Sequence, residues 1–193
     1  DNFGLTGTTL ASTLNSGGYT LTTVTPGTPA GNTAWANRNA YGAIFLGGRE
    51  VPSIPDLVSY VEGGGSVFLV GGTGAISGEG AYWNPFLSRF GLAFQTSYNA
   101  FTGDVSTSGF AAQNPFGAAL FTGVSTLFYN NGNTITAGGV PPDVSAQVFV
   151  GNDIGFFAAA QLGPTQVVPE PATVALVGAG VLVIGGIARR RRA

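Results

Sequence analysis

A run of 17 residues without a single charge, from Ala172 to Ala188, most constrains what this chain can fold into. Its one strongly hydrogen-bonding side chain is Thr173, and four arginines follow the run directly. As a helix, at 1.5 Å per residue, it would extend about 25 Å, slightly less than a typical hydrocarbon core. We therefore expect a transmembrane segment at residues 172–188 and a basic cytoplasmic tail at residues 189–193, because arginines beside a membrane segment stay on the cytoplasmic side.

A proline motif precedes this segment. Pro169-Glu170-Pro171, the apolar run and the arginine cluster resemble, in this order, the PEP-CTERM sorting signal of Gram-negative bacteria. The resemblance covers about Val168 to Arg192 and rests on Pro169, Glu170, Pro171, Arg189, Arg190, Arg191 and Arg192. It implies that an exosortase-type enzyme processes the tail, and that the body passes through the inner membrane to the cell surface or extracellular matrix. An ordinary membrane anchor with prolines before it by chance is the alternative.

The composition limits the chemistry of the body. The chain has no cysteine and no histidine, which excludes disulfides, thiolate metal sites and the commonest general base. We expect no cofactor and no metal. Residues 1–168 carry three arginines against eight carboxylates, a net charge of about −5, so nucleic acid is not an expected partner. A start at Asp1 without any methionine fits a mature form whose signal peptide has been removed.

Residues 43–70 contain the clearest folding unit. Ala43–Leu46 and Ser66–Val70 are short apolar runs, each followed by two glycines, and Pro52–Glu62 between them has the pattern of a helix. Apolar runs without alternation are typical of parallel strands covered by helices on both faces. We predict a right-handed crossover between two adjacent, central parallel strands, with Phe45 and Phe68 almost wholly buried.

The other segments alternate between helical and extended patterns. Helices are predicted over residues 5–15 and 83–90, with one helical turn within 35–41, and strands over 19–24, 92–95, 125–129, 134–137 and 146–150. Residues 97–115 form an excursion or a β-ribbon in this interpretation, and residues 154–162 a last strand or a short helix. Residues 164–171 are the expected linker, which contains the Pro-Glu-Pro box.

The order of YGAIFLGG, VEGGGSVFLVGG, YWNPFLSRFGLAF and NPFGAALFTGVSTL resembles domains with the type 1 glutamine amidotransferase-like fold. This resemblance is a pattern of elements over about residues 5–162. It implies one flavodoxin-like α/β domain over residues 1–163, built on a parallel sheet. Active members carry a nucleophilic cysteine in the turn equivalent to residues 71–75. Because this chain has neither that cysteine nor any histidine, glutamine amidotransfer is excluded.

One candidate ligand site follows from the predicted topology, since ligands of open α/β sheets bind beyond the carboxyl ends of strands. Arg49 would hold a carboxylate or sulfate there, Glu50 would act as an acid, and Thr73 would lie close by. A tight glycine turn with a local Arg49–Glu50 pair is the simpler interpretation, and we favour it. Glu79 and Asp104 are interpreted as solvated loop carboxylates in preference to a glycosidase pair.

The leading functional hypothesis is an exported, non-catalytic protein of the cell surface or extracellular matrix. The sparse ionisable groups of the body favour it. One alternative is an extracellular hydrolase or carbohydrate-binding module that acts on exopolysaccharide. Another is a self-assembling surface or filament subunit, because low charge favours association. The expected partners are thus the exosortase, the membrane before processing, and either exopolysaccharide or a second copy of the chain.

Overall fold

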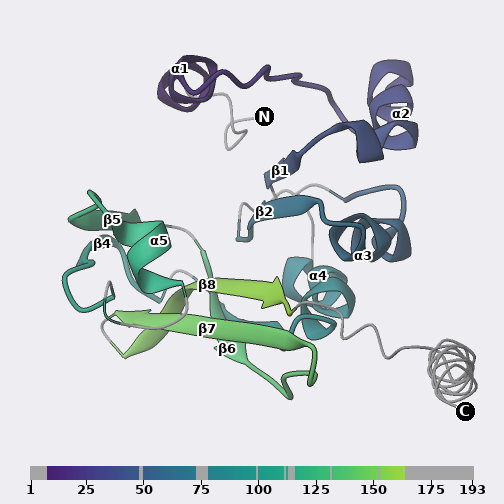
Figure 1. Cartoon of the computed structure of the whole chain (residues 1–193). Helices are drawn as coiled ribbons and strands as arrows, with labels where there is room; N and C mark the ends of the chain where they lie inside the picture. The colour runs from purple at the N-terminus through teal and green to yellow at the C-terminus, as the bar shows by residue number, and fades with distance from the viewer. Residues whose placement is uncertain are drawn as a thin grey trace, which may run out of the picture. The chain divides into compact units, whose positions relative to one another are not determined.

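The structure is a computed structural model of the chain (Figure 1). It describes residues 8–47, 50–72, 78–98, 100–110, 112, 116–130, 132–151 and 153–163. The chain divides into two units, Asp1–Gly163 and Pro164–Ala193, and every described residue belongs to the first. The expected linker, transmembrane segment and basic tail therefore lie outside the described residues. Within the described part, every helix is too short or too polar to cross a bilayer.

The amino-terminal part is helical. Helix α1 (Thr8–Ser16) is followed by α2 (Pro29–Ala36) and a 3-10 turn, η1 (Arg38–Ala40). The hydroxyl of Thr28 caps α2 by accepting the N–H of Gly31 at 3.1 Å, and a proline occupies the first helical position. The predicted helix over residues 5–15 is thus present from Thr8, and the helical turn predicted within residues 35–41 is confirmed.

The strand predicted over residues 19–24 is wrong. These residues form no strand, and Tyr19 and Val24 are 67% and 39% exposed. Alternation of apolar and polar residues stabilises a strand only when one face packs on a core and the backbone pairs with a neighbour. Residues 19–24 have neither this packing nor this pairing.

The predicted strand–helix–strand unit with parallel strands is confirmed, but its two strands form a two-stranded sheet among the described residues, so the prediction that both are central is wrong. Strand β1 (Ala43–Gly47) pairs in parallel with β2 (Ser66–Val70), and α3 (Ile54–Glu62) connects them. The hydroxyl of Ser53 caps α3 by accepting the N–H of Asp56 at 3.2 Å. One face of the strand pair packs against the core through Ile44, Leu46, Val67 and Leu69.

The opposite face of this pair corrects the expectation about burial. Phe45 and Phe68 are register partners with ring centroids 5.7 Å apart, but Phe45 is half-buried and Phe68 is 42% exposed. The prediction that both rings are almost wholly buried is therefore wrong. Burial on both faces was predicted because the two runs carry apolar residues on both faces. Only the face towards α3 contacts the core.

Helix α4 (Glu79–Ser88) leads into β3 (Leu92–Tyr98), which pairs antiparallel with β6 (Asn133–Ala137). The helix predicted over residues 83–90 is present with shifted ends. Its buried side chains include Trp83, which is wholly inaccessible, and Phe86. Both aromatic residues thus belong to the core.

The remaining strands also pair antiparallel. Strand β4 (Gly103–Ser106) pairs with β5 (Thr126–Tyr129), with α5 (Gly117–Phe121) between them in sequence, and β7 (Val144–Gly151) pairs with β8 (Ile154–Leu162) in a hairpin. Asp153 adopts a left-handed conformation in the hairpin turn, with a φ of 62°. Residues 154–162 thus form a strand, not a short helix. Residues 97–115 contribute one strand, β4, to a ribbon whose other strand, β5, lies outside this segment.

The fold is therefore mixed α/β with small sheets. Among the described pairings, β1–β2 is parallel and the other three are antiparallel. The expected flavodoxin-like parallel sheet consequently extends no further than one strand pair in this part of the chain. Strand pairing across long sequence separations, such as that of β3 with β6, is not encoded in local apolar patterns.

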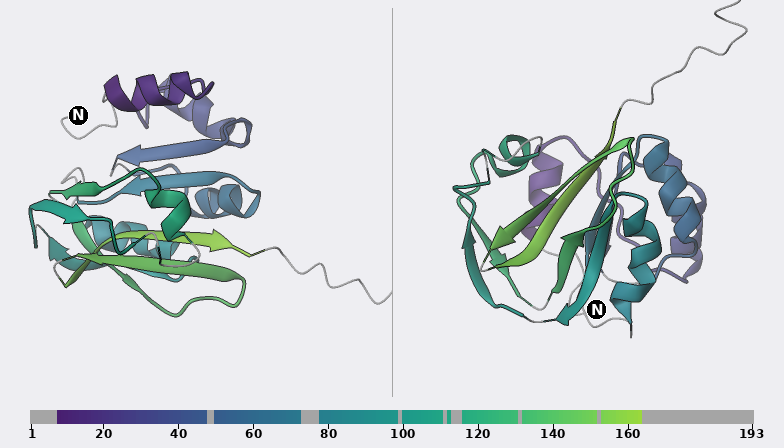
Figure 2. Two further views of the ribbon diagram at one scale, coloured as in Figure 1. Left: turned by 60° about the vertical axis from the view of Figure 1, so that its left-hand side comes forward. Right: turned by 90° about the horizontal axis from the view of Figure 1, so that it is seen from below.

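Two hydrophobic clusters hold these elements together. The first, cluster A, contains Val51, Leu57, Trp83, Phe86, Leu87, Phe90, Leu92 and Val144. The second, cluster B, contains Val105, Phe110, Phe121 and Phe149, packed by further phenylalanines. Figure 2 shows that α3 and α4 lie together on one side of the strands, away from the ribbon β4–β5.

Candidate functional site

The carboxyl ends of β1 and β2 are where the sequence predicts a ligand. Arg49 and Thr73 lie outside the described residues, so the anion clamp and the local Arg49–Glu50 pair remain predictions. Glu50 is exposed. Behind this edge, the described residues Val51, Gly72, Glu79 and Tyr82 form a set of two hydrogen-bonded pairs, Val51 with Tyr82 and Gly72 with Glu79.

Glu79 is the main polar group of this set. It is the first residue of α4, its side chain is buried, and its Oε2 accepts the N–H of Gly72 at 2.6 Å. Gly72 is the second residue after β2 and has a φ of 80°, a conformation that favours glycine. A carboxylate in the first turn of a helix is also stabilised by the helix dipole. Glu79 therefore joins the end of β2 to the start of α4.

The interpretation of Glu79 as a solvated loop carboxylate is wrong. It was misleading because Glu79 stands between glycines, a context typical of loops. Asp104, the other carboxylate considered with it, lies exposed on β4 and belongs to a different strand pair. The two residues are thus held by separate elements.

Tyr82 connects α4 to the segment after β1. Its hydroxyl donates to the carbonyl of Val51 and accepts the N–H of the same residue, both at 2.9 Å. Burial raises the pKa of Tyr82, the bond to Val51 opposes this shift, and the negative charge of Glu50 raises the pKa further. The phenol therefore stays protonated at neutral pH and holds the backbone of Val51. It has no property of a general base.

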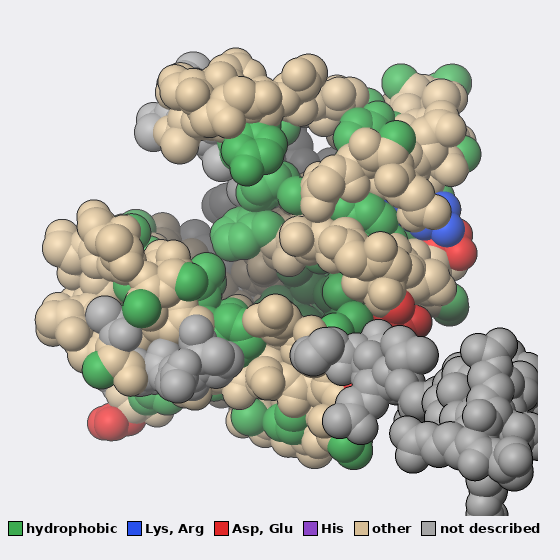
Figure 3. Space-filling model, viewed as in Figure 1, with side chains coloured by type: hydrophobic (Ala, Val, Ile, Leu, Met, Phe, Trp, Pro, Cys, Tyr) green, Lys and Arg blue, Asp and Glu red, His purple; other side chains and the backbone are tan. Residues whose placement is uncertain are grey.

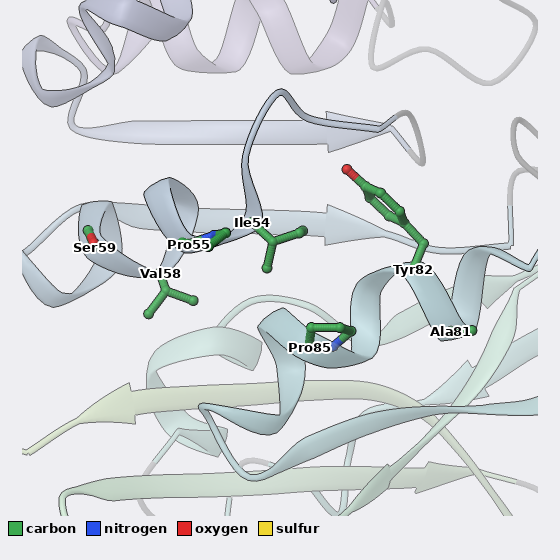
Figure 4. A pocket seen from close by; sticks show the side chains of 7 residues that line it. All are labelled: Ile54, Pro55, Val58, Ser59, Ala81, Tyr82 and Pro85. Atoms are coloured by element: carbon green, nitrogen blue, oxygen red, sulfur yellow. The ribbon is translucent and has the colours of Figure 1, made fainter.

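An apolar groove lies beside Tyr82, between α3 and α4 (Figure 4). Its volume is about 730 Å³, and its lining residues are Ile54, Pro55, Val58, Ser59, Ala81, Tyr82 and Pro85. The hydroxyl of Tyr82 points away from Pro85 in Figure 4 and is engaged with Val51. The groove thus offers mainly apolar surface, with Ser59 as its other hydroxyl-bearing residue, and sequence patterns alone did not predict it.

The arginines of the described body are engaged in ion pairs. Arg89 Nη2 lies 2.8 Å from Asp143 Oδ2, and Arg89 Nε lies 2.8 Å from Glu62 Oε1. The hydrogen bond from Arg89 lowers the pKa of Asp143. These contacts join α3, the end of α4 and the segment before β7. Sequence reasoning missed them, because residues 27 and 54 positions apart carry no local signal of contact.

Arg38 pairs with Asp56 at 3.4 Å and lies over the ring of Trp35, 5.5 Å from its centroid. The described residues contain no group of three or more carboxylates, histidines or cysteines suited to a metal ion. The polar groups that the structure does bring together therefore stabilise the fold, and none forms a nucleophile–base pair.

Comparison with known protein families gives a match near the carboxyl terminus, far in sequence from the residues described above. The model of the PEP-CTERM protein-sorting motif matches residues 167–192, a range that includes the Pro-Glu-Pro box and the four arginines. The match supports an exported chain that an exosortase processes at the membrane. Comparison with curated proteins and with solved structures gives no match, so the amidotransferase-like resemblance of the body has no support from either.

Proposed function

We propose that this chain is a non-catalytic protein of the cell surface or extracellular matrix, delivered there through its carboxyl-terminal sorting signal. The observation that carries the proposal is the sorting-motif match over residues 167–192. Residues 172–188 act as a transient membrane segment, and the arginines keep the end of the chain on the cytoplasmic side. The exosortase cuts the chain near the Pro-Glu-Pro box and releases the body from this anchor.

The state of the carboxylates supports a role without catalysis. Glu79 is buried and bonded to backbone, and Glu62, Asp56 and Asp143 are paired with arginines. A general acid donates a proton and a general base accepts one, so either group must lie within reach of a substrate. The carboxylates named here serve the fold, and a hydrolase built on them would have to break structural contacts.

Processing in cells tests the proposal. We would express the tagged chain in a host that has an exosortase and determine the intact mass of the surface fraction. A mature chain that ends between Pro169 and Ala172 is expected. A variant with alanines at Pro169, Glu170 and Pro171 should keep Arg189–Arg192 and stay in the membrane fraction. Surface material that retains the arginines in the unchanged protein would contradict the proposal.

Assays of the purified protein test the absence of catalysis separately. Amidase and glycosidase turnover should be indistinguishable from buffer. Turnover that disappears in a Glu50→Gln variant would instead establish the hydrolase alternative, because Glu50 is an exposed carboxylate beside the predicted ligand edge.

A further inference from the structure

The outer face of the ribbon β4–β5 carries an unusual combination of side chains. Asp104 is the register partner of Phe128, and Ser106 is the partner of Thr126. Because side chains alternate along strands, these four residues share one face. Thr102 and Asn130 flank the Asp104–Phe128 pair, and the hydroxyl of Thr102 donates to Asn130 Oδ1 at 3.3 Å. We call this face the ribbon platform: Thr102, Asp104, Ser106, Thr126, Phe128 and Asn130, all exposed.

The other face of the ribbon fixes this orientation. Val105 and Tyr129 are buried, and Val105 belongs to cluster B with Phe110, Phe121 and Phe149. Phe101 stacks on Tyr129 with centroids 6.1 Å apart and an interplanar angle of 9°. A slip of one residue would place Asp104 in this aromatic core, so the register is strongly specified. Phe128 is consequently held outward, 67% exposed, on a rigid support.

The platform suits a sugar ring better than a protein surface. One aromatic ring lies among a carboxylate, three hydroxyls and an amide, so apolar area is limited to a single side chain. A pyranose has an apolar C–H face and a rim of hydroxyls. The C–H face fits the electron-rich face of Phe128, and the rim meets the polar groups beside it. A flat face also suits an extended polymer, since small ligands bind in enclosed sites.

Charge decides which polymers fit. The platform has one carboxylate and no cation, and both arginines of the described residues, Arg38 and Arg89, pair with acids in other elements. Charged side chains are also sparse on the face of the molecule drawn in Figure 3. Anionic polymers are therefore repelled by Asp104, and nucleic acid lacks the cations it needs.

We propose that the ribbon platform binds a neutral polysaccharide, with a sugar ring stacked on Phe128 and its hydroxyls donating to Asp104. This rests on the proposed function, because a polysaccharide meets the body only outside the cell. In this proposal the body binds a ligand in the matrix, and the tail directs the protein there. A single ring contributes only a weak contact, so several such platforms along one polymer are needed for firm attachment.

Affinity electrophoresis of the full chain in mild detergent tests the proposal. The gels would contain a neutral glucan, mannan or galactan, or alginate as the anionic polymer. We expect retardation by at least one neutral polymer and none by alginate. Phe128→Ala and Phe128→Leu should both bind about tenfold more weakly, because leucine keeps apolar area but has no ring face. Val150→Ala, at an exposed apolar residue of β7, is the matched control and should bind as the unchanged protein does.

Binding by Phe128→Leu equal to that of the unchanged protein would overturn the proposal. So would an equal loss in Val150→Ala, or retardation by alginate alone, or by no polymer. Fluorescence of the buried Trp83 confirms that each variant is folded. Export and cleavage of the tail are measured separately, because Phe128→Ala should still be exported and cleaved. Failure of polymer binding therefore leaves the sorting function intact, and failure of cleavage leaves the platform intact.

Discussion

The N–H of Gly72, just after β2, donates a 2.6 Å hydrogen bond to the carboxylate of Glu79 at the start of α4. The bond is buried, so the acceptor is not shared with solvent. It holds the end of a parallel strand against the start of the next helix, at the edge where the sequence predicts a ligand. The buried carboxylate of this edge is therefore part of the scaffold.

Glu79→Ala should destabilise the protein, because it leaves the buried N–H of Gly72 without this acceptor. The expected loss is about 1–3 kcal/mol in the free energy of unfolding, measured by urea denaturation. Glu79→Gln keeps an acceptor oxygen and should lose less. Glu50→Gln, at an exposed carboxylate, is the control and should change stability by less than about 0.5 kcal/mol. Equal stability of Glu79→Ala and the control would show that the bond contributes nothing.

The two aromatic environments predict a graded effect of truncation. Phe149 is wholly buried in cluster B, and Phe149→Ala should cost about 3–5 kcal/mol. Phe68 is 42% exposed, so Phe68→Ala should cost clearly less, about 1–2 kcal/mol, because less apolar area leaves water on folding. Thermal and urea unfolding of both variants would measure the difference. A Phe68→Ala loss as large as that of Phe149→Ala would mean that the ring is buried after all.

The parts of the fold that follow from the sequence are those with local signals. The crossover from Ala43 to Val70 was predictable because apolar strands, a capped helix and glycine stops occur within one short stretch. The pairing of β3 with β6 was not, since it joins segments separated by β4, α5 and β5. The Tyr19–Val24 pattern failed for the same reason: a strand needs a partner, and alternation does not name one.

The candidate site, like the fold, was only partly predictable from the sequence. The sequence indicates the edge beyond β1 and β2 through its glycine pairs, and Glu50 is at that edge. It gives no sign that Glu79 turns inward, because burial of this carboxylate depends on the backbone N–H of Gly72 that donates to it. The ribbon platform depends on the register of β4 with β5, which only the structure provides.

Acid should weaken the contact between Arg89 and Asp143. The pKa of Asp143 is lowered from 3.8 by the hydrogen bond from Arg89, so its contribution to stability is present above the unfolded pKa and is lost as the pH falls through the folded pKa. The pKa of Arg89 is raised by the same bond and by Glu62, so Arg89 stays charged throughout. Asp143→Asn should therefore flatten the dependence of the melting temperature on pH below about pH 4. Asp153→Asn, at an exposed carboxylate outside this ion pair, is the matched control. If the melting temperature of Asp143→Asn still falls as steeply with decreasing pH as that of the control, the Arg89–Asp143 pair does not contribute to the loss of stability in acid.

The arginine cluster should determine the orientation of the tail. Replacement of Arg189, Arg190, Arg191 and Arg192 by serine removes the positive charges that hold the end of the chain in the cytoplasm in the proposed topology, while the apolar run and the Pro-Glu-Pro box stay unchanged. We expect less cleaved protein at the surface and more uncleaved precursor, as measured by immunoblot of fractionated cells. Substitution by four lysines is the matched control, because lysine keeps the charge, and it should retain most of the processing if charge is the property required. Processing lost equally with lysine and with serine would show instead that the sorting enzyme reads the guanidinium groups themselves.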